Sequence, residues 1–525
     1  MVQKTFYITT ALFYSNDNLH IGHAYESVAT DAMARYKRLR GYDVKFLTGM
    51  DEHGQKIERT ALSKNKQPQE YVDYIADLTK DLMKTMNIDY DIFWRTTSEA
   101  HKSAVKKIFN QLYEQGDIYK GIYEGMYCTP CEAFYTALQL DNSKCPVCSR
   151  EVEAIKEETY FFRLSKYQDR LLKHIEENPD FIKPTSRKNE MINNFLKPGL
   201  EDLSVSRTTF KWGIPVDFDA EHVVYVWIDA LSNYAVGLGY KSENPGEYEK
   251  YWPCDVHIVG KDIVRFHTII WPALLMALGQ PLPKQIFGHG WLNIDGKKMG
   301  KSLGNSVYPE VLTKRYGVDS LRYFLLREVV FGQDGNFTNE ALIGRINSDL
   351  ANDLGNLLSR TVGMIDKYFS GKLPSSQKDT EFDQDLIKAA DAAVKKSEEA
   401  YDKMHFSEAL SEIWNFVRRA NKYIDEVMPW QLFKETDKHD VLAGSLYKLS
   451  ESLRIIAILI SPVMPSTPNY IYSQLNIEDD TVKTWESSKN FGSISKEVKI
   501  TKGDIVFPRI DIKKELEELE KLGGK

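Results

Sequence analysis

The chain has 525 residues, of which 42% are hydrophobic and 27% charged, and its formal net charge is −7. At roughly 150 residues per domain this length predicts three or four domains, and the composition excludes a disordered, collagenous or purely coiled-coil chain. No apolar run reaches the roughly 18 residues of a membrane span, and the opening MVQKTFYITT lacks an apolar signal segment. We therefore expect a cytoplasmic protein with no membrane partner, in which local patches would bind any nucleic acid.

Strand and helix patterns alternate through the first hundred residues, which is typical of a parallel sheet with crossover helices. The pattern predicts strands over 5–10, 44–48 and 92–95 and helices over 20–40, 67–86 and 99–115. A Tyr- and Cys-rich stretch over 118–160 breaks the rhythm, and helices follow over 165–177 and 186–196. The alternation resumes with strands over 223–228, 256–259 and 286–288 and a helix over 263–277. This order predicts one nucleotide-fold domain interrupted by an insertion.

Helical periodicity dominates beyond residue 310. Apolar residues recur at helical spacing over 339–368, 382–402, 406–428 and 440–461. These segments predict an α-helical bundle, followed by a strand over 504–510 and a short leucine-spaced helix over 513–522.

The first of two candidate phosphate-binding segments is Asn18-Leu19-His20-Ile21-Gly22-His23, at the predicted start of the first helix. A helix N-terminus offers backbone N–H groups to an anion, and two imidazoles three residues apart point the same way and can donate hydrogen bonds. Taken alone, the motif fits two ordinary surface histidines beside a helix-start glycine equally well.

The second segment is Gly296-Lys297-Lys298-Met299-Gly300-Lys301-Ser302. It has three residues between its glycines where the Walker pattern needs four, so we exclude a P-loop nucleotidase. No GxGxxG follows a strand, which disfavours a nicotinamide enzyme. Lys298 and Lys301 can still neutralise a triphosphate, although the segment alone also fits a solvated basic turn.

Together these two motifs resemble the signature pair of class I aminoacyl-tRNA synthetases, and the resemblance to the bacterial methionyl-tRNA synthetases with one zinc knuckle covers nearly the whole chain. Four further segments carry it: Ala11-Leu12-Phe13-Tyr14, Gly49-Met50-Asp51-Glu52-His53-Gly54, Tyr225-Val226-Trp227-Ile228-Asp229-Ala230 and Gly260-Lys261-Asp262-Ile263-Val264-Arg265-Phe266-His267. Two departures stand out, because the family usually has Ser at the place of Gly300 and Pro at the place of Ala11 or Phe13. Neither departure removes a group with obvious chemistry.

The resemblance implies that methionine and ATP form methionyl-adenylate and pyrophosphate, after which methionine passes to the 3′-terminal ribose of tRNA(Met). Mg²⁺ would accompany ATP. The implied catalytic residues are His20, His23, Lys298 and Lys301. The implied ATP-binding residues are His20, Gly22, His23, Glu26, Gly260, Asp262, Lys298, Lys301 and Ser302. Asp262 would contact the ribose, and a helix N-cap is its plainer role.

By the same resemblance, a partly aromatic pocket suited to a thioether would hold methionine. Its implied residues are Ala11, Leu12, Tyr14, Trp227, Ala230, Tyr234, Ile263 and His267, with Asp51 binding the α-ammonium group. For any one aromatic residue without this context, core packing is the ordinary explanation.

Four cysteines form two CxxC pairs, Cys128 with Cys131 and Cys145 with Cys148. This spacing is close to that of structural Zn²⁺ sites, and four thiolates predict a closed, non-catalytic site that staples the insertion. The insertion is shorter than a hydrolytic editing domain, so we expect no dedicated editing site. Cys254 is expected to be an idle buried thiol.

The resemblance implies that the helical half reads the anticodon through Asn415, Arg419 and Trp485. An amide, a guanidinium and an aromatic ring suit unstacked RNA bases, and Arg418 and Lys422 would meet phosphate. Without the family, a solvated helix face and a core tryptophan explain these residues. Some relatives carry a further dimerising tRNA-binding module, which this chain lacks, so we expect a monomer.

The expected fold is α/β: a Rossmann-like parallel-sheet catalytic domain split by a zinc-binding insertion, then an α-helical anticodon-binding bundle. The expected segments are the first catalytic half over 1–115, the insertion over 116–222, the second catalytic half over 223–310, the lysine-loop and stem-contact region over 311–355, and the anticodon-binding domain with its tail over 356–525. Another class I synthetase and a non-tRNA adenylyltransferase are the enzyme alternatives. A zinc-knuckle RNA-binding protein without catalysis would leave both histidines and both lysines unexplained.

Overall fold

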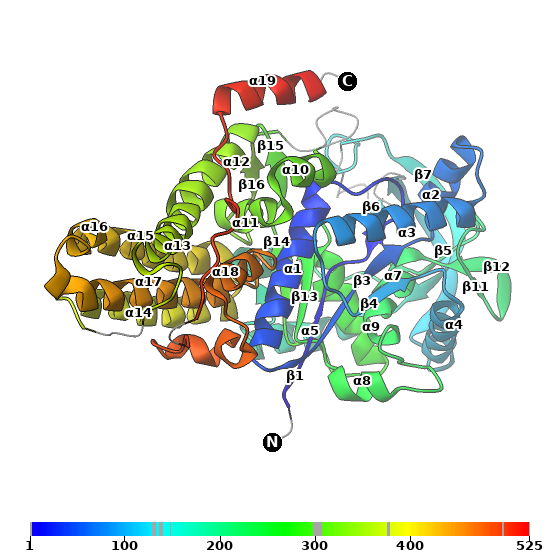
Figure 1. Cartoon of the computed structure of the whole chain (residues 1–525). Coiled ribbons are helices and arrows are strands. Elements are labelled where there is room, and N and C mark those ends of the chain that lie inside the picture. The colour runs from blue at the N-terminus through cyan, green and yellow to red at the C-terminus, as the bar shows by residue number, and fades with distance from the viewer. Residues whose placement is uncertain are drawn as a thin grey trace.

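The computed structural model describes residues 3–128, 133–135, 140–146, 149–297, 307–374, 378–495 and 498–523. A parallel sheet with its covering helices forms one end of the molecule and a helical bundle forms the other (Figure 1). The helix α19 (Ile512–Gly523) lies along one edge (Figure 1), where its Glu515 and Glu518 pair with Arg315 at 2.6 and 2.7 Å.

The central sheet is parallel throughout, with the strand order β2-β3-β1-β13-β14-β8 and β4 paired to β3 outside that path. Its strands are β1 (Thr5–Thr9), β2 (Phe13–Tyr14), β3 (Asp43–Asp51), β4 (Ile92–Arg95), β8 (Ile182–Lys183), β13 (Val256–Gly260) and β14 (Ile286–His289). Every residue of β13 and β14 is buried, because helices cover both faces of the sheet.

The two faces of the sheet carry different helices. Along β1, Phe6 and Ile8 pack in the core that α1 and α3 share, whereas Tyr7 packs in the core that contains α4, α7 and α9. This alternation follows from the two-residue period of a strand. The helices of this half are α1 (Ile21–Leu39), α2 (Gln55–Ser63), α3 (Pro68–Thr85), α4 (Glu99–Glu114), α7 (Val226–Val236), α8 (Gly246–Tyr251), η5 (Phe266–Ile270) and α9 (Trp271–Ala277).

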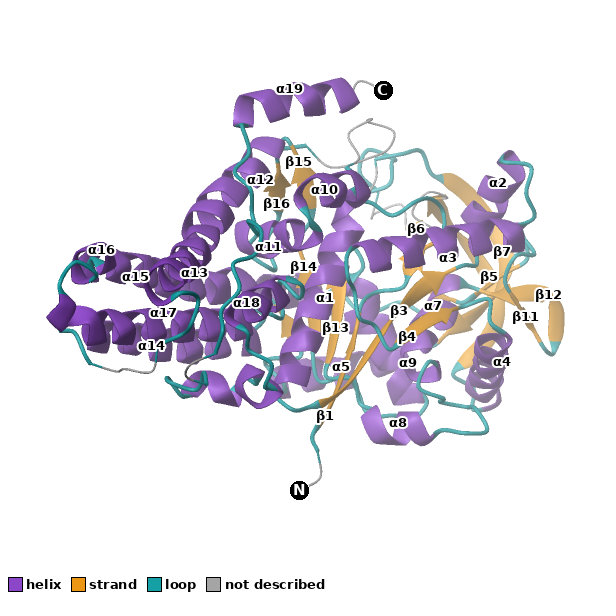
Figure 2. Ribbon diagram, viewed as in Figure 1, coloured by secondary structure: helices purple, strands orange, loops and turns teal. Residues whose placement is uncertain are grey.

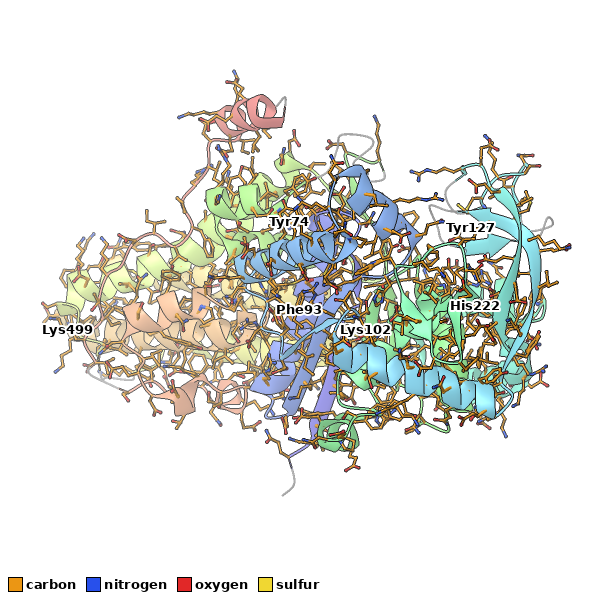
Figure 3. All side chains as sticks on the ribbon, turned by 90° about the vertical axis from the view of Figure 1, so that its right-hand side faces the viewer. Tyr74, Phe93, Lys102, Tyr127, His222 and Lys499 are labelled. Atoms are coloured by element: carbon orange, nitrogen blue, oxygen red, sulfur yellow. The ribbon has the colours of Figure 1, made fainter. Side chains whose placement is uncertain are left out.

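The segment between α4 and α7 builds two small antiparallel sheets, ordered β6-β5-β7-β9 and β10-β12-β11. Figure 3 views this side of the molecule, with Tyr127 and His222 labelled. Its strands are β5 (Ile118–Cys128), β6 (Ala133–Tyr135), β7 (Glu153–Phe162), β9 (Leu203–Ser204), β10 (Ser206–Arg207), β11 (Ile214–Val216) and β12 (Asp219–Val224). Its helices are η3 (Leu164–Tyr167), α5 (Gln168–Glu177), α6 (Thr185–Met191) and η4 (Ile192–Leu196). The same segment also supplies β8 to the edge of the central sheet.

The remaining chain is mostly helical (Figure 2). It contains one short parallel pair, β15 (Leu292–Ile294) with β16 (Gly335–Phe337). Its helices are α10 (Pro309–Tyr316) and α11 (Val318–Glu328) between these two strands, and then α12 (Asn339–Arg345), η7 (Ile346–Gly355), α13 (Asn356–Phe369), α14 (Asp383–Asp402), α15 (Phe406–Val427), α16 (Pro429–Leu432), η8 (Thr436–Lys438), α17 (His439–Ile460), α18 (Thr467–Leu475), η9 (Asp480–Lys483) and η10 (Glu486–Lys489). Across the described ranges, no helix combines the length and apolarity needed to cross a bilayer.

Two predicted strands are wrong. The strand expected over 223–228 is the end of β12 and the start of α7, because a short unbroken apolar run fits a buried strand and a buried helix equally well. The strand expected over 504–510 has no partner strand. Pro508 lacks a donor, and the backbone N–H and C=O of Ile510 instead bond the Asn347 side chain at 2.8 and 2.9 Å.

Candidate active site

Two adjoining cavities open at the carboxyl ends of β1, β3, β13 and β14, where parallel α/β sheets bind their ligands. They share one wall, formed by Ala11, Leu12, Tyr14 and Ile263. Two small molecules bound side by side across this wall would therefore meet at the sheet edge.

The first cavity, of about 190 Å³, contains every residue predicted to bind methionine. Its lining is Ala11, Leu12, Tyr14, Asp51, Lys56, Val226, Trp227, Ala230, Leu231, Asn233, Tyr234, Ile263 and His267. The helix α7 places Trp227, Ala230 and Tyr234 on one face at spacings of three and four. The Trp227 ring stacks on Phe266 with centroids 3.6 Å apart, so the aromatic wall is fixed by packing.

A hydrogen-bonded chain fixes the floor of this cavity. His267 Nδ1 lies 2.9 Å from the carbonyl oxygen of Ile263, which can only accept, so this nitrogen carries the ring proton. Burial lowers the pKa of His267 to about 4, so the ring is neutral near pH 7. Its Nε2 therefore accepts a hydrogen bond from the Tyr234 hydroxyl at 2.7 Å. The cavity floor thus has no charge, as a thioether side chain requires.

The second cavity, of about 330 Å³, brings together the predicted nucleotide residues that the structure describes. Its lining is Ala11, Leu12, Phe13, Tyr14, His20, Gly22, His23, Glu26, Gly260, Asp262, Ile263, His289, Gly290, Trp291 and Leu292. Asp262 follows β13 and accepts a hydrogen bond from Trp291 Nε1 at 3.2 Å. Lys298, Lys301 and Ser302, also predicted here, lie outside the described residues.

The two histidines at the start of α1 are held in defined tautomers. His20 Nδ1 accepts from the backbone N–H of Gly22, and His23 Nδ1 accepts from the backbone N–H of His20, both at 3.1 Å. A neutral imidazole with an accepting Nδ1 carries its proton on Nε2. Both rings therefore offer an Nε2–H donor, and their centroids are 4.0 Å apart at the wall of the second cavity.

The sequence pattern missed several residues that line the cavities, including Lys56, Asn233, His289 and Trp291. His289 ends the buried strand β14 and Trp291 lies two residues beyond it, in Gly288-His289-Gly290-Trp291. Their position at a parallel-strand end, between two glycines in the case of His289, was the available signal.

A buried carboxylate supports the first cavity from behind. Asp229 on α7 lies 2.7 Å from His53 Nδ1 and 2.8 Å from His101 Nε2. Burial raises the pKa of Asp229, but both histidines outweigh it and hold the pKa at about 2. Trp94 Nε1 donates to His101 Nδ1 at 2.9 Å, so Nε2 of that ring carries the proton given to Asp229. This network joins α7 to the segment just after β3 and to α4.

The structure brings together one cysteine from each predicted CxxC pair. Cys128 at the end of β5 and Cys145 are both fully buried and form one cluster, with Leu140 and Val152 packed against it. The partners Cys131 and Cys148 lie outside the described residues. Two buried thiols drawn from both pairs fit a four-thiolate metal site.

Two of the predicted anticodon residues share a face of α15. Asn415 is exposed, and its Nδ2 lies 3.4 Å from Glu412 Oε2. Arg419 is half-buried and bonds Glu426 Oε2 at 2.8 Å. Arg418, beside them, is half exposed and bonds Asp353 at 3.0 Å.

Trp485, the third predicted anticodon residue, is buried in this structure. Its indole is 1% exposed and lies edge-on to Tyr36 of α1 and to Tyr401 of α14. Its Nε1 donates to Glu398 Oε2 at 2.8 Å. The reason is that α1 and α14 bury the ring between them, a long-range packing that one sequence window does not reveal.

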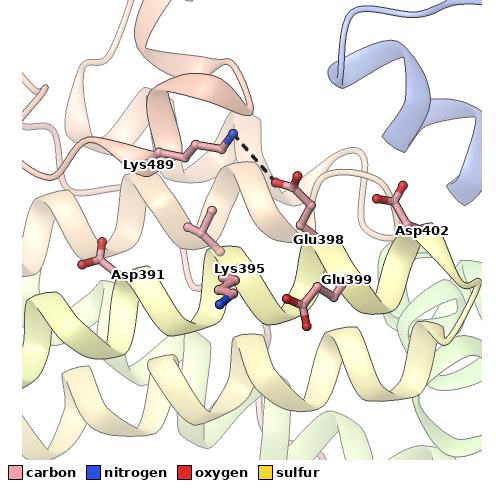
Figure 4. A pocket seen from close by; sticks show the side chains of 7 residues that line it. Asp391, Lys395, Glu398, Glu399, Asp402 and Lys489 are labelled. Atoms are coloured by element: carbon pink, nitrogen blue, oxygen red, sulfur yellow. Dashed lines mark ion pairs between the residues drawn. The ribbon is translucent and has the colours of Figure 1, made fainter.

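The groove beside Trp485 is acidic. Figure 4 shows it along α14, with the Lys489 ammonium turned toward Glu398 at 4.0 Å. Its lining is Asp391, Val394, Lys395, Glu398, Glu399, Asp402 and Lys489. Four carboxylates against two lysines disfavour an RNA backbone on this side of the helix.

The comparisons with known proteins agree with this geometry. The family model "tRNA synthetases class I (M)" matches residues 6–153 and 135–362, and the model "Anticodon-binding domain of tRNA ligase" matches residues 383–519. The methionine–tRNA ligase of Caldanaerobacter subterraneus subsp. tengcongensis is 63% identical over 99% of this chain and 81% of its own length. The methionine–tRNA ligase of Clostridium tetani is 58% identical over the same shares.

A solved structure is similar over its whole length. The Mycobacterium tuberculosis methionyl-tRNA synthetase in complex with methionyl-adenylate superposes with a TM-score of 0.92 at 41% identity, covering 97% of this chain and 100% of that chain. The match of both family models and the near-complete coverage leave one assignment. The chain belongs to the methionine–tRNA ligase family of class I tRNA synthetases.

Proposed function

We propose that the chain activates methionine with ATP, forming methionyl-adenylate and pyrophosphate, and then transfers methionine to the 3′-terminal ribose of tRNA(Met). The observation that carries this proposal is the pair of cavities with one common wall. One cavity is apolar and uncharged at its floor, and the other has two imidazole donors at a helix N-terminus.

Methionine would occupy the first cavity. Its thioether chain would pack between Trp227, Tyr234 and Ile263, and Asp51 at the end of β3 would bind the α-ammonium group. The substrate carboxylate would then lie at the common wall beside Ala11 and Leu12, where the nucleotide cavity begins. Selection of methionine would depend mainly on shape and neutrality, because the residues at the floor offer no charge.

The nucleotide would occupy the second cavity. The attack of the methionine carboxylate on the α-phosphorus needs no protein nucleophile, so the enzyme supplies position and charge. The Nε2–H groups of His20 and His23 would donate to phosphate oxygens as negative charge develops there. Asp262 would orient the ribose. Mg²⁺ bound with ATP would supply further charge stabilisation, and the family resemblance assigns the departing pyrophosphate to Lys298 and Lys301.

A structural Zn²⁺ held by Cys128, Cys131, Cys145 and Cys148 completes the proposal. The buried contact of Cys128 with Cys145 supports it, because thiols from both pairs meet in one place. Such a metal would fix the hairpin end of β5 and would take no part in the chemistry. Persistent thiolates also favour a reducing compartment such as the cytoplasm.

The catalytic and tRNA-binding functions would lie at different ends of the molecule. The chemistry would take place in residues 1–115 and 223–310, and residues 116–222 would form the insertion held by the metal. Residues 311–355 would contact the tRNA stem, and residues 356–525 would contact the anticodon. Within the last segment, Asn415 and Arg419 would read bases and Arg418 would meet phosphate, after exchanging their present acidic partners.

Methionine-dependent exchange of pyrophosphate into ATP tests the function. We expect exchange with methionine and none with leucine, valine or cysteine, which separates this enzyme from other class I synthetases. Replacing His23 with Ala should lower the exchange rate by about 10²–10³-fold. The matched control is His222→Gln, a buried histidine of the insertion, which should retain activity. A loss below about threefold for His23→Ala would contradict the assigned role of that ring.

A further inference from the structure

A buried ion pair lies at the back of the nucleotide cavity. His289, the last residue of β14, is 6% exposed, and its Nε2 lies 2.9 Å from Glu26 Oε2 on α1. Glu26 is also 6% exposed, and its other oxygen, Oε1, accepts the backbone N–H of Ala11 at 2.8 Å. One carboxylate therefore joins the histidine to the wall that both cavities share.

The hydrogen-bond partners of His289 fix its protonation. Its Nδ1 lies 2.8 Å from the carbonyl oxygen of Gly290, which can only accept a hydrogen bond. Its Nε2 faces the Glu26 carboxylate. Since each ring nitrogen faces an acceptor, both carry protons and the ring is an imidazolium. The backbone of Gly290 packs closely against that of Gln333, since a Cβ built at Gly290 would collide with it.

We propose that His289 is a positioning residue, which acts as a cation through Glu26 to hold the Ala11 backbone where methionine and ATP meet. This inference extends the proposed function by assigning it one more residue and a dependence on pH. When the ring loses a proton, one of its two acceptors loses its donor. If Glu26 loses it, the carboxylate faces a nitrogen lone pair and the Ala11 loop is released.

The surroundings set the direction of the pH effect. Burial lowers the pKa of His289, but the hydrogen bond and charge of Glu26, with smaller contributions from Gly290 and Asp262, raise it above the ordinary value. Among the described residues, two aromatic rings also pack against it: Tyr25 of α1 lies edge-on at 5.6 Å and Phe331 is stacked at 6.0 Å. The ion pair is therefore complete below the raised pKa, and it is lost as the pH rises through that value.

The test compares His289→Gln with the wild-type enzyme across pH 6 to 9.5, using kcat/KM for methionine in pyrophosphate exchange at saturating ATP. Glutamine can donate one hydrogen bond but never carries the charge. We expect the wild type to exceed the variant about tenfold at low pH, since a hydrogen bond to a charged group is lost. The ratio should fall toward one at high pH, where the wild type has also lost the pair. The ratio cancels every titration that both enzymes share, including those of methionine and ATP.

A ratio that stays constant with pH would overturn the proposal, because a merely structural histidine gives the same loss at every pH. The control His222→Gln should keep the ratio to wild type independent of pH. If neither enzyme exchanges pyrophosphate with methionine, the proposed function fails and not this inference alone. Nitrogen-15 spectra of histidine-labelled enzyme decide the case if His289→Gln does not fold. The His289 ring should show two protonated nitrogens at pH 7, and a single protonated nitrogen there would also refute the proposal.

Discussion

Replacing Arg322 with Met tests how the helical half is fastened to the catalytic half. Arg322 lies on α11 with a side chain that has no exposed surface. Its guanidinium donates to Asp31 Oδ2 on α1 at 2.6 Å and to the carbonyl oxygens of Val463 and Met86 at 2.8 and 3.0 Å. It therefore joins α1, the end of α3 and the turn after α17.

The expected loss follows from what the substitution leaves behind. Asp31 keeps two donors, Arg35 Nε at 2.7 Å and the backbone N–H of Asp89 at 2.8 Å, so its carboxylate remains hydrogen-bonded. The buried carbonyls of Val463 and Met86 lose their donor, and each such acceptor costs about 1–3 kcal/mol. Breaking a buried ion pair costs about 3–5 kcal/mol in total, and we expect the lower end, about 3 kcal/mol, because Asp31 remains bonded.

The assay is the midpoint of urea unfolding followed by tryptophan fluorescence, with wild type, Arg322→Met and Arg35→Met measured together. Arg35 is the matched control because it binds the same oxygen of Asp31, but its side chain is 21% exposed. Because water reaches the Arg35 end of this pair, we expect its loss to cost less, about 1 kcal/mol. If Arg322→Met destabilises the chain no more than Arg35→Met does, burial is not what gives the pair its strength and the reasoning is refuted.

Removal of the proposed Zn²⁺ by a chelator should loosen the insertion and lower aminoacylation, and full activity in metal-free protein verified by elemental analysis would argue against a structural metal. Trp485→Ala should damage pyrophosphate exchange and aminoacylation equally and lower stability by about 3–5 kcal/mol, because the ring is buried against α1; a defect confined to the tRNA KM would instead restore an RNA-binding role. Asp229→Asn should lower the free energy of unfolding at pH 7 by about 2 kcal/mol, since the folded pKa of about 2 lies below the unfolded value of 3.8. That difference is complete above the unfolded pKa and should shrink as the pH falls from 4 toward 2, so melting temperatures that differ equally at pH 7 and pH 3 would contradict it.

Most helices and the parallel sheet could be predicted because their periodicity is local. The helix expected over 406–428 is α15 (Phe406–Val427), for example, since its apolar stripe recurs every three or four residues. Most of the predicted methionine and nucleotide residues that the structure describes converge because they follow the carboxyl ends of neighbouring parallel strands. Trp227, Ala230 and Tyr234 come instead from α7.

The rest depended on contacts between distant parts of the chain. The burial of Trp485 follows from Tyr36 and Glu398, which are far from it in sequence. The charge on His289 follows from Glu26, 263 residues away, and no pattern near His289 in the sequence predicts that partner. The apolar run over 223–228 predicts a strand wrongly, because a run this short and unbroken does not distinguish the period of a strand from that of a helix.

The helix α1 carries two imidazoles of the second cavity at one end and the contacts to the bundle at the other. His20 and His23 lie at its start, whereas Lys37 and Arg40 near its end bond Asp402 and Glu398 of α14 at 2.7 and 2.9 Å. Its 19 residues span about 28 Å, so a tilt of about 5° at the bundle end would displace the histidines by about 2.5 Å. A misplacement of about 1 Å can cost about 10²-fold in rate. The positions of His20 and His23 at the second cavity therefore depend partly on how firmly α14 holds the far end of α1.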